Sequence, residues 1–257
     1  MRPGVLPIDV FADIIKGCLD MLFPPRCAGC GQGVREDAVF CDECSASVVR
    51  VASPVCRVCG LPLGCFGPSE VQEETCARCL REPPRFDRAR AVYQYSGAMA
   101  RAIRKFKFKR CVELGKRLAL LLAPALADMA EEDPVVVVPV PLHPRRLRER
   151  EFNQALVLAQ AACRVCNRWG KSRVLRPDPW ALRRVRDTVP QSNCTAAERR
   201  ENVVHAFAAC KERVAGREVL LIDDVLTTGA TAGACAAALL DAGARRVEVL
   251  TLARALP

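Results

Sequence analysis

Histidine is scarce in this sequence, since the 257 residues include only His143 and His205. Histidine is the usual general acid or base at neutral pH and a frequent ligand of open zinc sites. Histidine-based catalysis and histidine-rich metal centres are therefore poor prospects. A zinc-dependent deaminase or hydrolase is also excluded, because it needs a histidine ligand and an open metal position.

Long apolar runs are absent too. No uninterrupted run reaches the roughly 18 residues of a transmembrane helix, and the N-terminus has no signal-peptide pattern. We therefore expect a cytoplasmic protein without a transmembrane segment, with a peripheral position at the inner membrane as an option. Residues 8–23 place apolar side chains at helical spacing. Such a helix can lie on a membrane, but its polar face is not lysine-rich, which favours packing on its own protein.

Positive charge is in excess, with a net charge of +10 at pH 7. This favours anionic partners, either phosphate esters or nucleic acid. Residues 101–110 interleave basic residues with Phe106 and Phe108, a pattern that can hold single-stranded DNA. The same pattern fits a solvated face with two core phenylalanines, or a contact of Lys105 or Lys107 with a substrate phosphate. The sequence leaves these three interpretations open.

Cysteine is abundant: there are sixteen, and eight of them form four C-x-x-C pairs before residue 80. Two such pairs complete a closed tetrahedral site, so we expect two structural Zn²⁺ ions. The eight ligands are Cys27, Cys30, Cys41, Cys44, Cys56, Cys59, Cys76 and Cys79. Sequential pairing is the simplest arrangement, and an interleaved one stays open. Cys65 lies outside the spacing, whereas Cys163 and Cys166 share one face of a predicted helix and are expected in the core.

Three parts are predicted: an N-terminal helix over residues 1–25, a double zinc ribbon over 26–82 and an α/β domain over 83–257. The ribbon segment has too few apolar residues for a core, so the metal must supply most of its folding energy. In the third part strands alternate with helices. The strands are expected over 89–95, 135–140, 219–222 and 246–252, and the helices over 113–130, 154–168 and 232–242. A polar, arginine-rich stretch over 182–207 is either a surface loop or an active-site flap.

The most informative stretch runs from Val219 to Thr231. Four apolar residues predict a strand buried on both faces, which Asp223 and Asp224 follow. The next residues, 227–231, form a threonine-glycine loop that enters a helix, and such a loop suits a phosphate. Carboxylates would repel a phosphate, but they suit sugar hydroxyls or Mg²⁺ beside it. The pattern predicts a site for a phosphorylated sugar.

This stretch closely resembles the phosphoribosyl pyrophosphate (PRPP) motif of type I phosphoribosyltransferases. The resemblance implies that PRPP binds with Mg²⁺, that Asp223 and Asp224 hold the ribose hydroxyls, and that either acid assists catalysis. The implied 5′-phosphate loop consists of Thr227, Thr228, Gly229, Ala230 and Thr231. From their place after a strand, the basic residues Arg145, Arg146 and Arg150 are candidates to meet the pyrophosphate.

A wider set of motifs covers nearly the whole chain. In order, they are L-F-P-P-R-C-A-G-C-G, the paired C-x-x-C ribbons, V-P-V-P-L-H, R-E-R-E-F-N-Q-A, R-x-x-x-T-x-x-Q, R-x-x-N-V and D-D-V-x-T-T-G-A-T. The sequence resembles the ComF family, which joins a double zinc ribbon to a type I phosphoribosyltransferase domain. That resemblance implies a role in natural competence and DNA uptake, with competence-machinery proteins as candidate partners. Two residues depart from the family pattern: Glu151 replaces a usual glycine, and His205 replaces a usual small residue.

Two functions follow from these observations. In the first, the protein is a phosphoribosyltransferase whose pyrophosphate leaves from C1 of PRPP toward an unknown acceptor. In the second, it is a non-catalytic adapter whose zinc ribbons and basic face bind single-stranded DNA or a partner protein.

Overall fold

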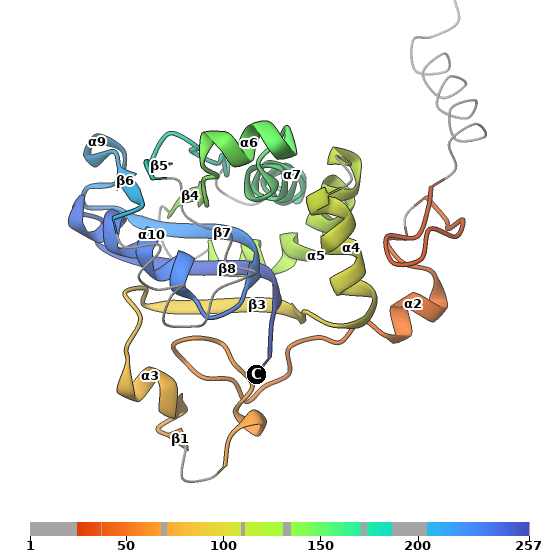
Figure 1. Ribbon diagram of the computed structural model, residues 1–257, viewed down its shortest axis with the longest axis horizontal. Helices are drawn as coiled ribbons and strands as arrows, with labels where there is room; N and C mark the ends of the chain where they lie inside the picture. The colour runs from red at the N-terminus through yellow and green to blue at the C-terminus, as the bar shows by residue number, and fades with distance from the viewer. Residues whose placement is uncertain are drawn as a thin grey trace, which may run out of the picture.

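A four-stranded parallel sheet forms the centre of the protein, in the order β3-β8-β7-β4 (Figure 1). The computed structural model describes residues 25–36, 38–67, 71–108, 111–130, 135–170, 174–186 and 205–256, so the helix predicted over 8–23 lies outside the described residues. The strands of the sheet are β3 (Arg88–Gln94), β4 (Val135–Pro139), β7 (Glu218–Leu226) and β8 (Arg246–Arg254).

Strand β7 is buried on both faces, as its apolar run predicts. Leu220 and Ile222 belong to one hydrophobic core, while Val219 and Leu221 belong to a second core on the other face. This follows from the strand geometry, in which successive side chains point to opposite faces. The sheet is therefore the middle layer of three.

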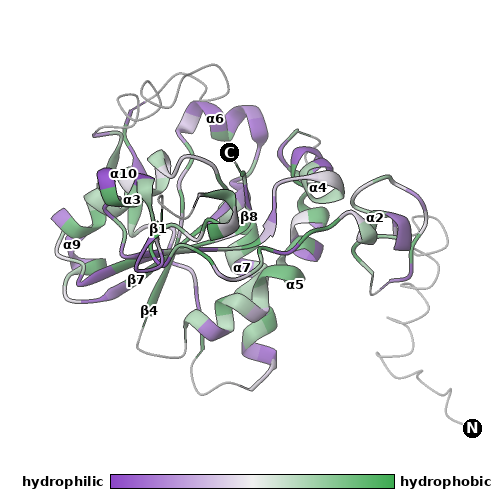
Figure 2. Ribbon diagram, turned by 90° about the horizontal axis from the view of Figure 1, so that it is seen from below, coloured by the Kyte–Doolittle hydropathy of each residue, from purple (hydrophilic) through white to green (hydrophobic). Residues whose placement is uncertain are grey.

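Helices form the two outer layers, and Figure 2 shows α5 and α7 on the opposite side of the sheet from α10. The larger helices are α4 (Gly97–Phe108), α5 (Val112–Met129), α7 (Gln154–Arg168) and α10 (Ala230–Asp241). Cys163 and Cys166, each 1% exposed, lie on the buried face of α7 in the core, which confirms their predicted position. Smaller elements of this domain are α6 (Pro144–Arg150), β5 (Leu182–Arg184), β6 (Phe207–Ala209) and α9 (Lys211–Val214).

The two N-terminal ribbons repeat one local plan. Each has a C-x-x-C-G turn in which the glycine N–H donates to the carbonyl of the first cysteine, from Gly31 to Cys27 at 3.0 Å and from Gly60 to Cys56 at 2.9 Å. Both glycines have positive φ, +92° and +68°, a conformation that favours glycine. In each ribbon the third cysteine directly precedes a short helix. The elements of this region are α2 (Asp42–Ala46), η1 (Leu63–Cys65), β1 (Val71–Gln72), β2 (Thr75–Cys76) and α3 (Ala77–Arg81).

The ribbon region covers the outer edge of β3. Between the ribbons, the N–H of Val51 donates to the carbonyl of Val92, and the N–H of Gln94 donates to that of Val49. In the second ribbon, the carbonyl of Val58 accepts from the N–H of Ala89 at 2.7 Å. An uncovered edge strand invites pairing with other chains, so these contacts protect the sheet as well as anchoring the ribbons.

The structure confirms the predicted fold class, an α/β domain built on a parallel sheet and preceded by two cysteine clusters. Within the described ranges, every helix is too short or too polar to cross a membrane.

Candidate functional site

A cavity of about 670 Å³ lies at the carboxyl ends of β4 and β7, where ligands of open α/β sheets bind. Its wall includes nine residues of special interest. They are Lys107, Arg146, Arg150, Arg184, Asp223, Asp224, Thr227, Gly229 and Thr231. These residues come from α4, α6, β5, β7, the loop before α10 and the first turn of α10, so the fold gathers residues that lie far apart in the sequence.

The two acids are part of β7 rather than following it. The strand continues to Leu226 because its backbone stays paired with β8, up to the register Leu226–Arg254. The carboxylate of Asp223 accepts a hydrogen bond from the N–H of Asp224 at 2.8 Å. Both acids line the cavity although neighbouring strand residues point to opposite faces.

Lys107 is the positive partner of this acid pair, with its Nζ 2.9 Å from Oδ1 of Asp224. Burial disfavours the charged lysine, but the carboxylates of Asp224 and Asp223 outweigh burial and raise the pKa of Lys107 above its ordinary value. For Asp223, burial and the neighbouring Asp224 raise the pKa to about 7, against the opposing effect of Lys107. The site therefore holds closely coupled charges.

The loop between β7 and α10 forms another part of the wall. Gly229 has a φ of +83° and precedes the first turn of α10, where backbone N–H groups and the helix dipole favour an anion. Thr227, Gly229 and Thr231 line the cavity. Thr228 instead accepts a hydrogen bond on Oγ1 from the N–H of Ala230 at 3.3 Å, and these two residues line a second cavity.

Helix α6 carries all three predicted arginines and brings two of them to the cavity. Pro144 begins the helix and His143 caps it by accepting from the N–H of Arg145, so the basic segment is helical rather than an open loop. Arg146 and Arg150 line the cavity. Arg145 does not; it is exposed, and its Nε lies 3.3 Å from Oε1 of Glu149.

Gln154 and Tyr95 also line the cavity and were not identified from the sequence. Gln154 is 2% exposed and accepts on Oε1 from Arg150 at 3.0 Å. Its Nε2 is buried and has no hydrogen-bond partner among the described residues. The available signal for Gln154 was its place in the R-E-R-E-F-N-Q-A motif. Tyr95 follows a strand distant in sequence, and nothing local distinguished it.

The polar stretch over 182–207 contributes Arg184 to the cavity. Residues 187–204 of that stretch lie outside the described residues, so its role as a flap stays a prediction.

Within residues 101–108 of the basic and aromatic stretch, several side chains make internal contacts. Phe106 is fully buried, whereas Phe108 is 72% exposed and has the Arg150 guanidinium 5.6 Å from its ring centre. Lys105 donates to the carbonyl of Gly29 at 2.8 Å, and Lys107 pairs with Asp224. This stretch thus joins the first ribbon to the cavity.

The cysteines gather in two groups of four, and in each group the sulfurs lie within 4.8 Å of one another. The first group is Cys27, Cys30, Cys41 and Cys44, and the second is Cys56, Cys59, Cys76 and Cys79. A tetrahedral site with Zn–S bonds of about 2.3 Å separates its sulfurs by about 3.8 Å. The Cys30–Cys41 and Cys59–Cys76 sulfur distances are 3.7 and 3.8 Å, so both groups fit zinc in the sequential pairing.

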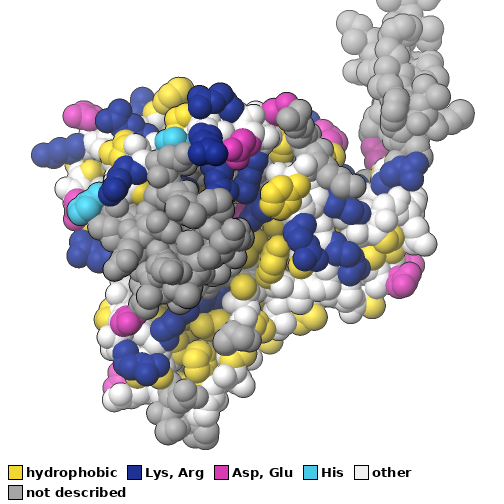
Figure 3. Space-filling model, in the orientation of Figure 1, with side chains coloured by type: hydrophobic (Ala, Val, Ile, Leu, Met, Phe, Trp, Pro, Cys, Tyr) yellow, Lys and Arg dark blue, Asp and Glu magenta, His cyan; other side chains and the backbone are white. Residues whose placement is uncertain are grey.

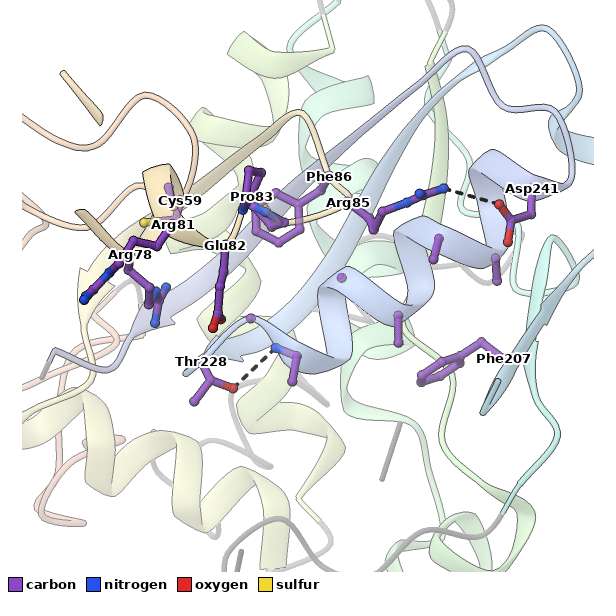
Figure 4. A pocket seen from close by; sticks show the side chains of 18 of the residues that line it. Cys59, Arg78, Arg81, Glu82, Pro83, Arg85, Phe86, Phe207, Thr228 and Asp241 are labelled. Carbon is purple, nitrogen blue, oxygen red and sulfur yellow. Dashed lines mark hydrogen bonds and ion pairs between the residues drawn. The ribbon is translucent and has the colours of Figure 1, made fainter. Parts of the chain in front are cut away.

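A second cavity of about 680 Å³ lies between α10, the second ribbon and the segment that joins this ribbon to β3 (Figure 4). Glycine and alanine residues of α10 form one wall, and Phe86 and Phe207 also line it. At its edge, Arg85 and Asp241 form an exposed ion pair of 3.3 Å. The loop before α10 separates this cavity from the first, since Gly229 lines both.

Comparisons with known proteins match both parts of the chain. Residues 18–80 match the family model of the double zinc ribbon domain. The DNA utilization protein YhgH of Escherichia coli O6:H1 is 33% identical, over 84% of this chain and 91% of that protein. Competence protein F of Haemophilus influenzae is 30% identical, over 82% of this chain and 90% of that protein.

One solved structure is similar at a lower level, the structure of the allosteric regulatory enzyme of purine biosynthesis. The match has 21% identity and a TM-score of 0.33, and it covers 54% of this chain. The chain spans only about a quarter (26%) of the matched protein, and so distant a match supports no functional argument.

Proposed function

Because the chain belongs to the ComF family, we propose that its α/β domain binds PRPP with Mg²⁺ and that the protein takes part in DNA utilization or competence. Relatives named for these processes match most of the chain, which supports the cellular role. The choice of PRPP as the ligand rests on the residues that line the cavity.

The observation that carries this proposal is the combination of opposite charges in one cavity. Asp223 and Asp224 offer acceptors to the ribose hydroxyls, while the loop beside them offers N–H groups and threonine hydroxyls to the 5′-phosphate. Arg146 and Arg150 line the same cavity and suit a pyrophosphate. Lysine and arginine side chains are exposed over several parts of the face in Figure 3, which also favours an anionic ligand.

The carboxylate and hydroxyl oxygens that line the cavity also suit Mg²⁺, which binds such oxygens together with the phosphates of a bound substrate. When bound with PRPP, Mg²⁺ would neutralise charge on the pyrophosphate. Lys107 already neutralises Asp224, so the ribose must compete with this lysine or share the carboxylate with it. The buried Nε2 of Gln154 is a hydrogen-bond donor that a ligand oxygen could satisfy.

Titration calorimetry with PRPP and Mg²⁺ tests the ligand. The wild type should bind, and the double variant Asp223→Asn/Asp224→Asn should bind at least 10-fold more weakly, because hydrogen bonds to charged groups are worth about 1.5–3 kcal/mol. Glu218→Gln is the matched control, since it neutralises an acid at the other end of β7, where Glu218 pairs with Arg245. Equal affinities of the wild type and the double variant would contradict the assignment.

Pyrophosphate release separates the enzyme from the adapter. Chemistry at C1 requires stabilisation of the departing pyrophosphate in a site shielded from water, and the arginines of α6 could supply the stabilising charge. If PRPP binds without any pyrophosphate release in the presence of candidate acceptors, the site senses PRPP rather than transferring its phosphoribosyl group.

A further inference from the structure

Arg254, the last residue of β8, is an unusual buried charge. Its side chain is among the largest in the core, and the residue is only 1% exposed. All three guanidinium nitrogens are buried without a hydrogen-bond partner among the described residues. An isolated buried charge is very costly, so a counter-charge must lie nearby.

The second cysteine group lies next to this arginine. Leu256, two residues beyond Arg254, packs against the cluster formed by Cys56, Cys59, Leu61, Cys76 and Cys79. The guanidinium of Arg254 lies close enough to Cys59, Cys79 and Cys76 for charge on their sulfurs to act on it. Arg78 is a further cation close enough to act on Arg254, but it is only partly buried.

A zinc ion bound by four thiolates carries a net negative charge, because the thiolates outnumber the charges of the metal. We propose that Arg254 is the buried counter-charge of the second zinc centre, supplied by the central sheet rather than by the ribbon. The arginine stabilises the zinc-bound thiolates, and the centre in turn offsets the cost of burying a guanidinium. Groups around the ligands of a metal site commonly have this role.

The position of Arg254 links the second zinc centre to the candidate ligand cavity. Its carbonyl accepts from the N–H of Tyr95 at 2.7 Å, and it lies opposite Leu226 of β7. Leu226 and Tyr95 line the candidate ligand cavity. The second zinc centre is therefore connected through one residue to the sheet end that carries this cavity.

Zinc release from the intact, zinc-loaded chain tests the proposal. A chromogenic chelator measures the release rate, and thiol alkylation with mass spectrometry shows which cysteine group has lost its metal. In Arg254→Met we expect zinc loss from the second group to accelerate by about 10- to 100-fold, in proportion to the loss of metal affinity that is typical when a residue supporting the ligands is removed. Loss from the first group should not change.

Arg101→Met is the matched control, since Nη2 of Arg101 lies 3.7 Å from the Cys44 sulfur of the first group. Its removal should leave zinc release from the second group unchanged, because Arg101 contacts a cysteine of the first group. Arg254→Lys, which keeps the positive charge, should retain zinc better than Arg254→Met. It also keeps the test decisive if the methionine variant does not fold.

Thermal unfolding distinguishes a counter-charge from a packing role. Arg254→Met should melt below the wild type when zinc is bound, but not below it in excess chelator, because the zinc-free wild type has lost the negative charge beside Arg254. Equal zinc release from the second group in both proteins would overturn the proposal. An equal drop in melting temperature with and without zinc would also overturn it, since that indicates packing alone.

Discussion

Three ionisable side chains lie together in the cavity at the end of β7: Asp223, Asp224 and Lys107. Among the described residues, Asp224 has an ion pair with Lys107 and Asp223 has none, so Asp223 carries most of the cost of burial. Its pKa of about 7 means that this carboxyl changes charge near neutrality. A ligand that donates hydrogen bonds to Asp223 would favour its charged form.

The raised pKa predicts a pH-dependent effect of Asp223→Asn on stability. The ordinary pKa of 3.8 applies to the unfolded chain, so the folded state binds the proton more tightly between pH 3.8 and about 7. Stability from this group is present at low pH and is lost as the pH rises through 7. Relative to the wild type, the free energy of unfolding of Asp223→Asn should therefore increase by about 2 kcal/mol from pH 5.5 to pH 8.

Urea unfolding of the zinc-loaded proteins at both pH values measures this difference. Glu218→Gln, which removes an acid from the other end of the same strand, is the matched control. A difference between Asp223→Asn and the wild type that stays constant with pH would contradict the prediction.

At the scale of elements, the connection between α6 and α7 explains one departure from the family pattern. Glu151 ends α6 with a φ of +67°, in the left-handed region, and its N–H donates to the carbonyl of Leu147 at 2.7 Å. A glycine adopts this conformation without the steric cost of a Cβ atom. The glutamate thus preserves the turn but strains it, and His205, with a φ of +55°, is a second residue of this kind.

Glu151→Gly should therefore stabilise the protein by about 1 kcal/mol, because relief of the left-handed strain exceeds the loss of chain entropy. The expected rise in melting temperature is roughly 2–4 °C for a domain of this size. Scanning calorimetry measures it.

Glu151→Ala is the control for this prediction, since it removes the carboxylate but keeps the Cβ atom. If the alanine variant gains as much stability as the glycine variant, charge rather than backbone strain is the cause.

At the scale of the whole molecule, the zinc ribbons pack against the α/β domain and support its structure. The first ribbon contacts α4 and α5 through Lys105 and through Arg117, whose guanidinium donates to the carbonyls of Arg26 and Ala38. The second ribbon covers β3. Metal binding therefore also determines how much of the sheet edge is exposed.

Removal of zinc should release two ions per chain and unfold the ribbons, whose small cysteine-rich clusters cannot fold without metal. Loss of their contacts with β3 should cost several kcal/mol and lower the melting temperature of the remaining domain by on the order of 10 °C. Hydrogen exchange should become faster at the amides of Ala89 and Gln94, which donate to the ribbon region.

The amides of β8, in the interior of the sheet, are the internal reference for this measurement, and restored zinc should reverse the change. Unchanged exchange at Ala89 and Gln94 in the zinc-free protein would indicate that the ribbons are not needed to cover the sheet edge.

The sequence by itself determined the elements whose signals are local. The apolar run from Val219 to Ile222 predicted a strand buried on both faces, and the C-x-x-C spacing predicted two tetrahedral sites, because side-chain period and ligand reach act over a few residues. The family motifs indicated the order of the domains in the same way. The candidate site residues in β7 and its loop are contiguous, so the sequence could propose them together, although Thr228 and Ala230 line the second cavity instead.

Only the tertiary structure decided which distant residues meet. It grouped the cysteines sequentially, brought Lys107 to Asp224, and placed Arg146 and Arg150 at the cavity but Arg145 outside it. It also placed Arg254 beside the second cysteine group. These relations depend on the packing of helices and strands that lie far apart in the chain, which local spacing does not encode. They also depend on burial, because a charge removed from water needs an opposite charge nearby.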